Sequence, residues 1–224
     1  MRGVIVMTLL LWMGAESIGF AQNSRPVYAG GLFGVSTLSA DGRSIVTPPQ
    51  ARVSLYKPEN GPAVNAFAGV HLHRYLSVQG NYVWNRNDVA LLSSVVTPSG
   101  GAFYEQGRGS AQHALVADVL LYFRSLDSRV RPYLSAGIGL VRFSSKRIRN
   151  ELTTGLEAPT GTIRATEAGL RVAVGIDMAM SDRWSFRYSF SETISRNPIS
   201  AQLTPRGERG LANFQNLFGV VRKF

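Results

Sequence analysis

The stretch Trp-Ser-Phe-Arg-Tyr-Ser-Phe at residues 184–190 alternates aromatic and polar side chains at every second position. A period of two is typical of a β-strand with one apolar and one polar face. Residues 167–178 alternate in the same way, and the short link 181–183 leads into the segment that begins at Trp184. The sequence therefore predicts an antiparallel hairpin in this region.

The same alternation, in weaker form, predicts further strands at residues 26–38, 62–73, 75–85, 111–124, 130–143 and 209–224, which makes eight. The connections 73–75, 125–129 and 181–183 are short, whereas 39–60, 86–109, 144–163 and 197–208 are long. Successive connections of an up-and-down barrel lie on opposite rims. We therefore expect an all-β, eight-stranded antiparallel up-and-down barrel with four long loops on one rim and three short turns on the other.

The first residues have the pattern of a secretory signal peptide. Arg2 precedes the apolar run 4–13, and Gly19 and Ala21 supply the small residues that a signal peptidase needs. The run is about half of the roughly 20 residues that a membrane-spanning helix requires. We predict cleavage after Ala21, which leaves residues 22–224 as one domain. The chain has no cysteine, which excludes disulfides and suits an oxidising compartment.

Alternation alone does not distinguish a membrane barrel, apolar outside, from a soluble lipocalin-like barrel, apolar inside. Residues 168–178 give the roughly 9 to 11 residues that a tilted strand needs to cross a bilayer. Aromatic residues near strand ends resemble the girdles of a membrane barrel. The expected girdle residues are Tyr75, Tyr122, Phe123, Tyr133 and Trp184 at the short-turn rim and Tyr82, Trp84 and Phe143 at the other. We therefore predict a transmembrane barrel, with segment 50–56 as a candidate strand extension beyond the bilayer.

The C-terminus carries a resemblance to a known family. Phe214, Phe218, Val220 and Phe224 share one strand face, and the chain ends in Phe. Together with the signal peptide, the strand number and the loop asymmetry, this pattern resembles the OmpA/OmpX-like family of small outer-membrane barrels. Segments 59–62, 69–71 and 82–88 also resemble members of the broader outer-membrane β-barrel superfamily. One departure is Arg222, where the family's terminal signal usually has an aromatic or apolar residue.

The resemblance implies a bacterial outer-membrane location, contact with outer-membrane lipids, and recognition of Phe224 by the barrel-assembly machinery. We expect a monomer with the long loops outside the cell.

The polar face of the predicted strands contains charges of both signs. They are Asp118, Glu167, Arg171, Asp177 and Arg187. These residues are expected to pair across the lumen and plug it, because eight strands enclose a space that side chains can fill. Small residues on the same face leave a narrow diffusion pore as an alternative. They are Gly137, Gly139, Gly169, Ala173 and Gly175.

The long connections with their flanking residues are basic, with 12 Lys and Arg against 7 Asp and Glu, a difference of 12 − 7 = +5. Lys146, Arg147 and Arg149 form the densest cluster, and they are candidate contacts for lipopolysaccharide phosphates. The cluster lacks the interleaved aromatic residues of a nucleic-acid surface, so we expect no nucleic-acid partner.

Candidate catalytic and metal-binding residues are few. His113 should face lipid near the long-loop rim, where a Ser on an adjacent strand would be needed for a lipid A-modifying enzyme. His71 and His73 share a strand face, but no acid or third His lies nearby in the sequence, so neither a metal nor a cofactor is expected. The sequence thus favours a non-enzymatic envelope protein with a structural or surface-interaction role. A narrow pore is the first alternative, and a lipid A-modifying enzyme is the second.

Overall fold

The structure is a computed structural model that describes residues 27–38, 41–47, 50–58, 60–97, 100–148, 152–199 and 210–224. The predicted signal peptide, residues 1–21, lies outside these ranges. No helix in the described residues has the length and apolar character to cross a membrane.

Eight strands form a closed antiparallel ring, in agreement with the predicted barrel. Each of these strands pairs with the ring strands that come before and after it in the sequence. The first strand, β1, pairs with the last, β11, and so closes the ring. The ring consists of β1 (Val27–Leu38), β4 (Asn60–His73), β5 (Leu76–Thr97), β6 (Gly100–Tyr122), β7 (Val130–Arg147), β9 (Ile163–Ala179), β10 (Trp184–Arg196) and β11 (Gly210–Lys223).

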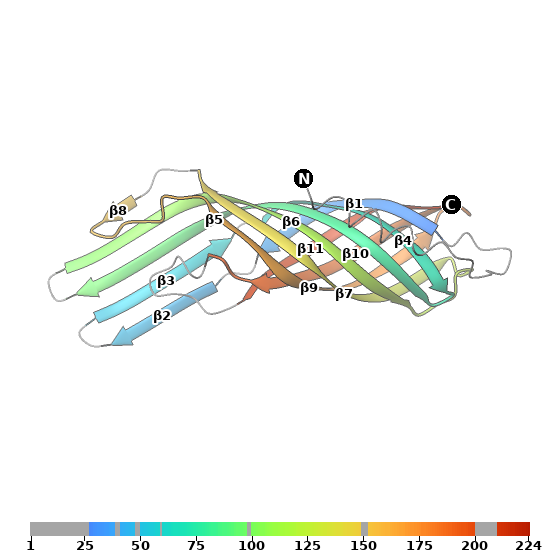
Figure 1. Cartoon of the computed structure of the whole chain (residues 1–224), viewed down its shortest axis with the longest axis horizontal. Helices are drawn as coiled ribbons and strands as arrows, with labels where there is room; N and C mark the ends of the chain where they lie inside the picture. The colour runs from blue at the N-terminus through green and yellow to red at the C-terminus, as the bar shows by residue number, and fades with distance from the viewer. Residues whose placement is uncertain are drawn as a thin grey trace, which may run out of the picture.

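A sheet projects from the long-loop end of the barrel (Figure 1). The strands β5 and β6 have 22 and 23 residues, about twice what a bilayer requires, and stay paired with each other as far as Thr97 and Gly100. The hairpin of β2 (Asp41–Thr47) and β3 (Gln50–Pro58) adds to the free edge of β5, and β8 (Leu152–Thr154) adds to β6. Segments 39–60 and 86–109, which were expected to be loops, therefore contain paired strands, and the predicted extension at 50–56 is part of β3.

The apolar face of the wall points outward. Ile138 is 73% exposed, and Val174 is 48% exposed while its neighbour Ala173 is 8% exposed. An outward apolar face excludes the soluble barrel with an apolar interior, and it suits a wall in contact with lipid.

The outward aromatic residues only partly match the expected girdles. Tyr75, Phe123 and Trp184 are exposed on the outer wall near the short-turn rim. The expectation is wrong for Tyr122, Tyr133 and Phe143, which are buried inside the barrel. Their strand parity explains this difference, because each lies next to outward-facing positions on its strand, Leu121 and Phe123 for Tyr122, Leu134 for Tyr133 and Arg142 for Phe143, and so belongs to the inward face.

Candidate functional site

A buried ion pair occupies the lumen toward the short-turn rim. Arg187 on β10 and Asp177 on β9 are direct cross-strand partners. Arg187 donates from Nε to Asp177 Oδ1 at 2.6 Å and from Nη2 to Oδ2 at 2.7 Å. Both side chains are almost fully buried. This two-bond geometry satisfies both carboxylate oxygens, which a buried pair needs to offset its desolvation.

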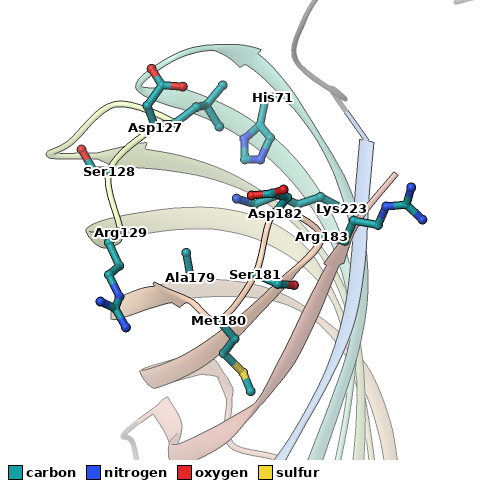
Figure 2. Close-up of a pocket in the computed structure, with 11 residues that line it drawn as sticks. His71, Asp127, Ser128, Arg129, Ala179, Met180, Ser181, Asp182, Arg183 and Lys223 are labelled. Carbon is teal, nitrogen blue, oxygen red and sulfur yellow. The ribbon is translucent and has the colours of Figure 1, made fainter.

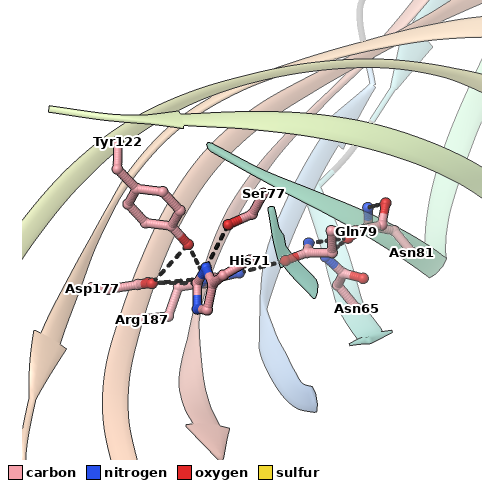
Figure 3. A network of polar contacts seen from close by, with 8 residues as sticks. All are labelled: Asn65, His71, Ser77, Gln79, Asn81, Tyr122, Asp177 and Arg187. Carbon is pink, nitrogen blue, oxygen red and sulfur yellow. Dashed lines mark hydrogen bonds and ion pairs between the residues drawn. The ribbon is translucent and has the colours of Figure 1, made fainter. Parts of the chain in front are cut away.

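The pair extends into a polar network across the lumen (Figure 3). The Tyr122 hydroxyl donates to Asp177 Oδ2 at 3.1 Å and accepts from Arg187 Nη2 at 3.0 Å. Arg187 Nη1 donates to Gln79 Oε1 at 2.7 Å. Gln79 in turn donates to Asn81 at 2.7 Å, and Asn65 donates to Asn81 at 3.2 Å. The network thus joins side chains from strands on opposite sides of the barrel.

Aromatic rings enclose the Arg187 guanidinium. Its central carbon lies 4.8 Å from the ring centre of Phe67, 5.0 Å from that of Tyr133 and 5.6 Å from that of Tyr28. Cation–π contacts of this kind strengthen in surroundings that exclude water. Rings and polar network together occupy the lumen at this level.

A second ion pair lies farther from the short-turn rim. Arg171 on β9 donates to Asp118 on β6, and both side chains are buried. Gly137 on β7 lies between them, paired with Asp118 on one side and Arg171 on the other. Because Gly137 has no side chain, the two charged groups meet across the intervening strand.

The structure therefore brings together four of the five predicted lumen charges, in two pairs. The fifth, Glu167, is half-buried nearer the long-loop end of β9 and belongs to neither pair. Gln79 and Asn81 were not among the predicted lumen residues, and Tyr122 was expected on the outer wall. Their inward strand parity was a usable signal, but the cross-barrel contacts depend on register.

Three of the predicted small lumen residues lie close against larger neighbours. An ideal Cβ on Gly175 would lie 2.4 Å from the Tyr133 ring, and one on Gly137 would lie 2.1 Å from Asp118 Oδ1. An ideal Cβ on Gly169 would lie 2.5 Å from a Val141 methyl group. These glycines make room for larger neighbours.

The short-turn end has an open vestibule of about 780 Å³ (Figure 2). Its lining includes charged groups of both signs, which are Asp127, Arg129, Asp182, Arg183 and Lys223. His71 also lines the vestibule and is held by a 2.5 Å hydrogen bond between Nδ1 and Ser77 Oγ and by stacking on Tyr28. The described residues contain no group of three or more His, Cys, Asp or Glu side chains placed to hold a metal.

Chain that follows β8 contacts the inside of the barrel at its long-loop mouth. Arg108, a fully buried residue of β6, donates to the carbonyl oxygen of Pro159 at 2.9 Å and to that of Gly161 at 2.6 Å. Gln106 also donates to the Pro159 carbonyl, at 3.0 Å. Ala158 packs in an apolar cluster with Leu38, Val89, Leu91, Tyr104, Phe143, Ile163, Ile199 and Leu211. Residues 156–161 are thus tied to the barrel interior at this end.

The predicted surface residues lie apart from the lumen. Lys146 and Arg147 are exposed at the end of β7, and Arg149 is outside the described residues. Phe224 is exposed at the short-turn rim, where its amide donates to the Val27 carbonyl at 3.0 Å. Arg222 lies over the rings of Phe224 and Trp184, at 5.0 and 5.7 Å. Arg222, which departs from the family's terminal signal, therefore contacts aromatic rings on the outer wall.

The model of the outer membrane protein beta-barrel domain matches residues 6–224. The chain belongs to this family. It is a bacterial outer-membrane β-barrel protein, as the resemblance implied. No curated protein matches the barrel in sequence.

Solved structures support the same fold. Neisserial surface protein A is similar with a TM-score of 0.52 and 16% identity over 91% of this chain and 100% of that chain. The outer membrane protein OprG from Pseudomonas aeruginosa is similar with a TM-score of 0.54 and 12% identity over 90% of this chain and 97% of that chain. At these identities the likeness extends to the fold alone.

Proposed function

We propose that this barrel is a closed, non-enzymatic protein of the outer membrane with a structural or surface-interaction role. The observation that supports this most directly is the packed lumen. The Arg187–Asp177 network crosses the barrel toward the short-turn rim, and residues 156–161 are hydrogen-bonded to buried Arg108 at the long-loop mouth. A passage for solutes would require both regions to open.

The projecting sheet supports a role at the cell surface, with the long-loop end outside the cell. Exposed Val96, Phe103 and Leu152 lie on β5, β6 and β8 beyond the barrel. We further propose that the barrel is a monomer, because its ring of strands is already closed and leaves no sheet edge in the wall for a second copy. The proposed partners are lipopolysaccharide, at the basic residues of the long-loop rim such as Lys146, Arg147 and Arg149, and the barrel-assembly machinery, at Phe224.

The enzymatic alternative has less support. His113 lies on the outer wall, where its Nδ1 is 2.8 Å from the Tyr82 hydroxyl. Ser144 lines the same surface hollow, but no hydrogen bond joins it to His113 in the described part of the chain. A nucleophilic serine needs a base within hydrogen-bond reach, and this geometry does not provide one.

Conductance in a planar lipid bilayer tests the closed lumen. The refolded full-length barrel should insert and remain electrically silent, and Arg171→Ala should leave it silent because the Arg187 network and the filled mouth persist. Insertion is verified by a heat-dependent shift in gel mobility, which reports the folded barrel. Discrete current steps in the unmodified protein that change with Arg171→Ala would establish a pore and contradict the proposal.

A further inference from the structure

A hollow of about 500 Å³ lies in the outer wall near the long-loop end, away from the lumen. It is lined by His113 on β6, by Arg142, Ser144 and Lys146 on β7, and by Arg164 on β9. The three basic side chains are exposed, whereas the intervening residues Val141, Phe143 and Ser145 are buried. Strand parity therefore places the whole lining on the face that contacts the membrane or its surface.

The register of the strands gathers these side chains. His113 pairs with Arg142, and Ser144 pairs with Arg164, on the two sides of β7. Lys146 follows on the same face of β7. Asp and Glu are absent from the described residues that line the hollow, so its lining is uniformly basic and polar.

The depth of the hollow follows from the residues below it on the same face. On β7 the outward series is apolar as far as Ile138 and Leu140, which are 73% and 59% exposed, and then becomes basic at Arg142. Leu115 continues the apolar zone on β6. A change from apolar to cationic side chains on a lipid-facing wall marks the boundary between hydrocarbon and headgroups. The hollow thus lies at headgroup depth.

We propose that this hollow binds the phosphorylated headgroup of a lipopolysaccharide molecule in the outer leaflet. Arg142, Lys146 and Arg164 would pair with its phosphates through charge-assisted hydrogen bonds. Ser144 and His113 supply polar groups for the sugar, and the hydrogen bond to Tyr82 holds the imidazole in place. The inference rests on the proposed orientation of the long-loop end toward the outside of the cell.

The spacing of the cations favours a headgroup with more than one phosphate. Arg142 and Lys146 are four residues apart on one strand, or about 13 Å at roughly 3.3 Å per residue. Arg164 lies on the neighbouring strand, opposite the position between them. A single phosphate cannot easily contact the side chains of Arg142 and Lys146 together. A disaccharide that carries a phosphate at each end can reach both. Because the cations belong to strands, their backbone positions are fixed before the lipid binds.

Binding to purified lipid tests the proposal. The barrel is reconstituted in phosphatidylcholine nanodiscs that contain diphosphorylated lipid A at low mole fraction, and native mass spectrometry counts the lipid A retained. The triple variant Arg142→Gln/Lys146→Gln/Arg164→Gln should lose at least about tenfold in affinity, because it removes every charge-assisted contact. The matched control is Arg74→Gln/Arg124→Gln/Arg183→Gln, which removes three exposed charges at the short-turn rim; it should bind like the unmodified protein.

Two further lipids separate specific binding from general attraction. Dephosphorylated lipid A and phosphatidylglycerol should each bind the unmodified barrel at least about tenfold more weakly than diphosphorylated lipid A. Equal binding of all three lipids, or equal losses in the two triple variants, would overturn the proposal.

A single substitution keeps the test valid if the triple variant does not fold. Ser144→Asp places one negative charge in the hollow and should also weaken lipid A binding. Unchanged affinity in folded Ser144→Asp would count against the site. Conductance of the same preparations distinguishes the lipid-binding proposal from the proposed closed lumen. If the barrel conducts and still binds lipid A selectively, only the closed lumen is contradicted.

Discussion

At the scale of single residues, Gly137 shows how the lumen depends on a missing side chain. An ideal Cβ at this position would lie 2.1 Å from Asp118 Oδ1 and 2.3 Å from the Ala117 carbonyl oxygen. We expect Gly137→Ala to destabilise the barrel by about 3 kcal/mol, through overpacking and loss of the Arg171–Asp118 pair. Urea unfolding in lipid vesicles measures this. Gly31→Ala is the control, since its Cβ meets no atom within 4 Å; equal effects of the two substitutions would contradict the role of Gly137.

The Arg187–Asp177 pair makes a second prediction at this scale. Asp177→Asn removes the charge that faces buried Arg187, and breaking a buried pair from one side typically costs about 3 to 5 kcal/mol. Replacing both partners, as in Asp177→Leu/Arg187→Met, should recover most of this loss because no unpaired charge remains. Urea unfolding of the single and double variants provides the comparison. A double variant less stable than Asp177→Asn would show that the pair is not the main cause.

Which lumen residues are charged was predictable, but their partners were not. Strand parity placed Asp118, Arg171 and Arg187 on the inward face, because alternation is a local property of the sequence. Pairing depends on the register between strands and on packing across the barrel. Arg171 therefore reaches Asp118 over Gly137, and Glu167, on the same face of β9, stays outside both pairs.

At the scale of strands, inward and outward positions on β9 should respond differently to the same substitution. Val174→Arg places a charge on the lipid-facing wall and should cost about 2 to 4 kcal/mol near the bilayer midplane. Ala173→Arg directs the side chain into the packed lumen, where its effect is steric and should not depend on the lipid. Unfolding in bilayers of different thickness tests this, because thickness changes how deep residue 174 lies in the hydrocarbon. Only the loss of stability caused by Val174→Arg should therefore vary between the bilayers. The same thickness dependence in both variants would contradict the assignment of the faces.

The strands of the barrel wall were predictable from alternation, and their outer ends were not. β5 was expected to end at residue 85 but continues to Thr97, and over residues 89–96 it pairs with β6 on one side and β3 on the other. Gly, Pro and charged residues in these segments resemble loop composition. Pairing with two neighbouring strands stabilises β5 there, and this tertiary contribution is not visible in one segment of sequence.

At the scale of the whole molecule, Arg108 couples the barrel wall to the chain that closes its mouth. Arg108→Gln removes its charge-assisted hydrogen bonds to the carbonyls of Pro159 and Gly161. Residues 156–161 should then open more often, and proteolytic cleavage there should accelerate by roughly tenfold. Time-resolved digestion of the folded barrel measures the rate. Arg86→Gln, which changes an exposed arginine on β5, should digest like the unmodified protein; equal acceleration in both variants would contradict the role of Arg108.

The projecting sheet has a mechanical consequence. Its strands β5 and β6 continue from the wall without a break in pairing, and the roughly 12 outer residues of β5 extend about 40 Å at roughly 3.3 Å per residue. An antibody bound to the tip would therefore be joined to the barrel by continuous paired strands and not by a flexible linker. Torque at the tip would reach the bilayer, so the tilt of the antibody arm in a micrograph should report the tilt of the barrel beneath it.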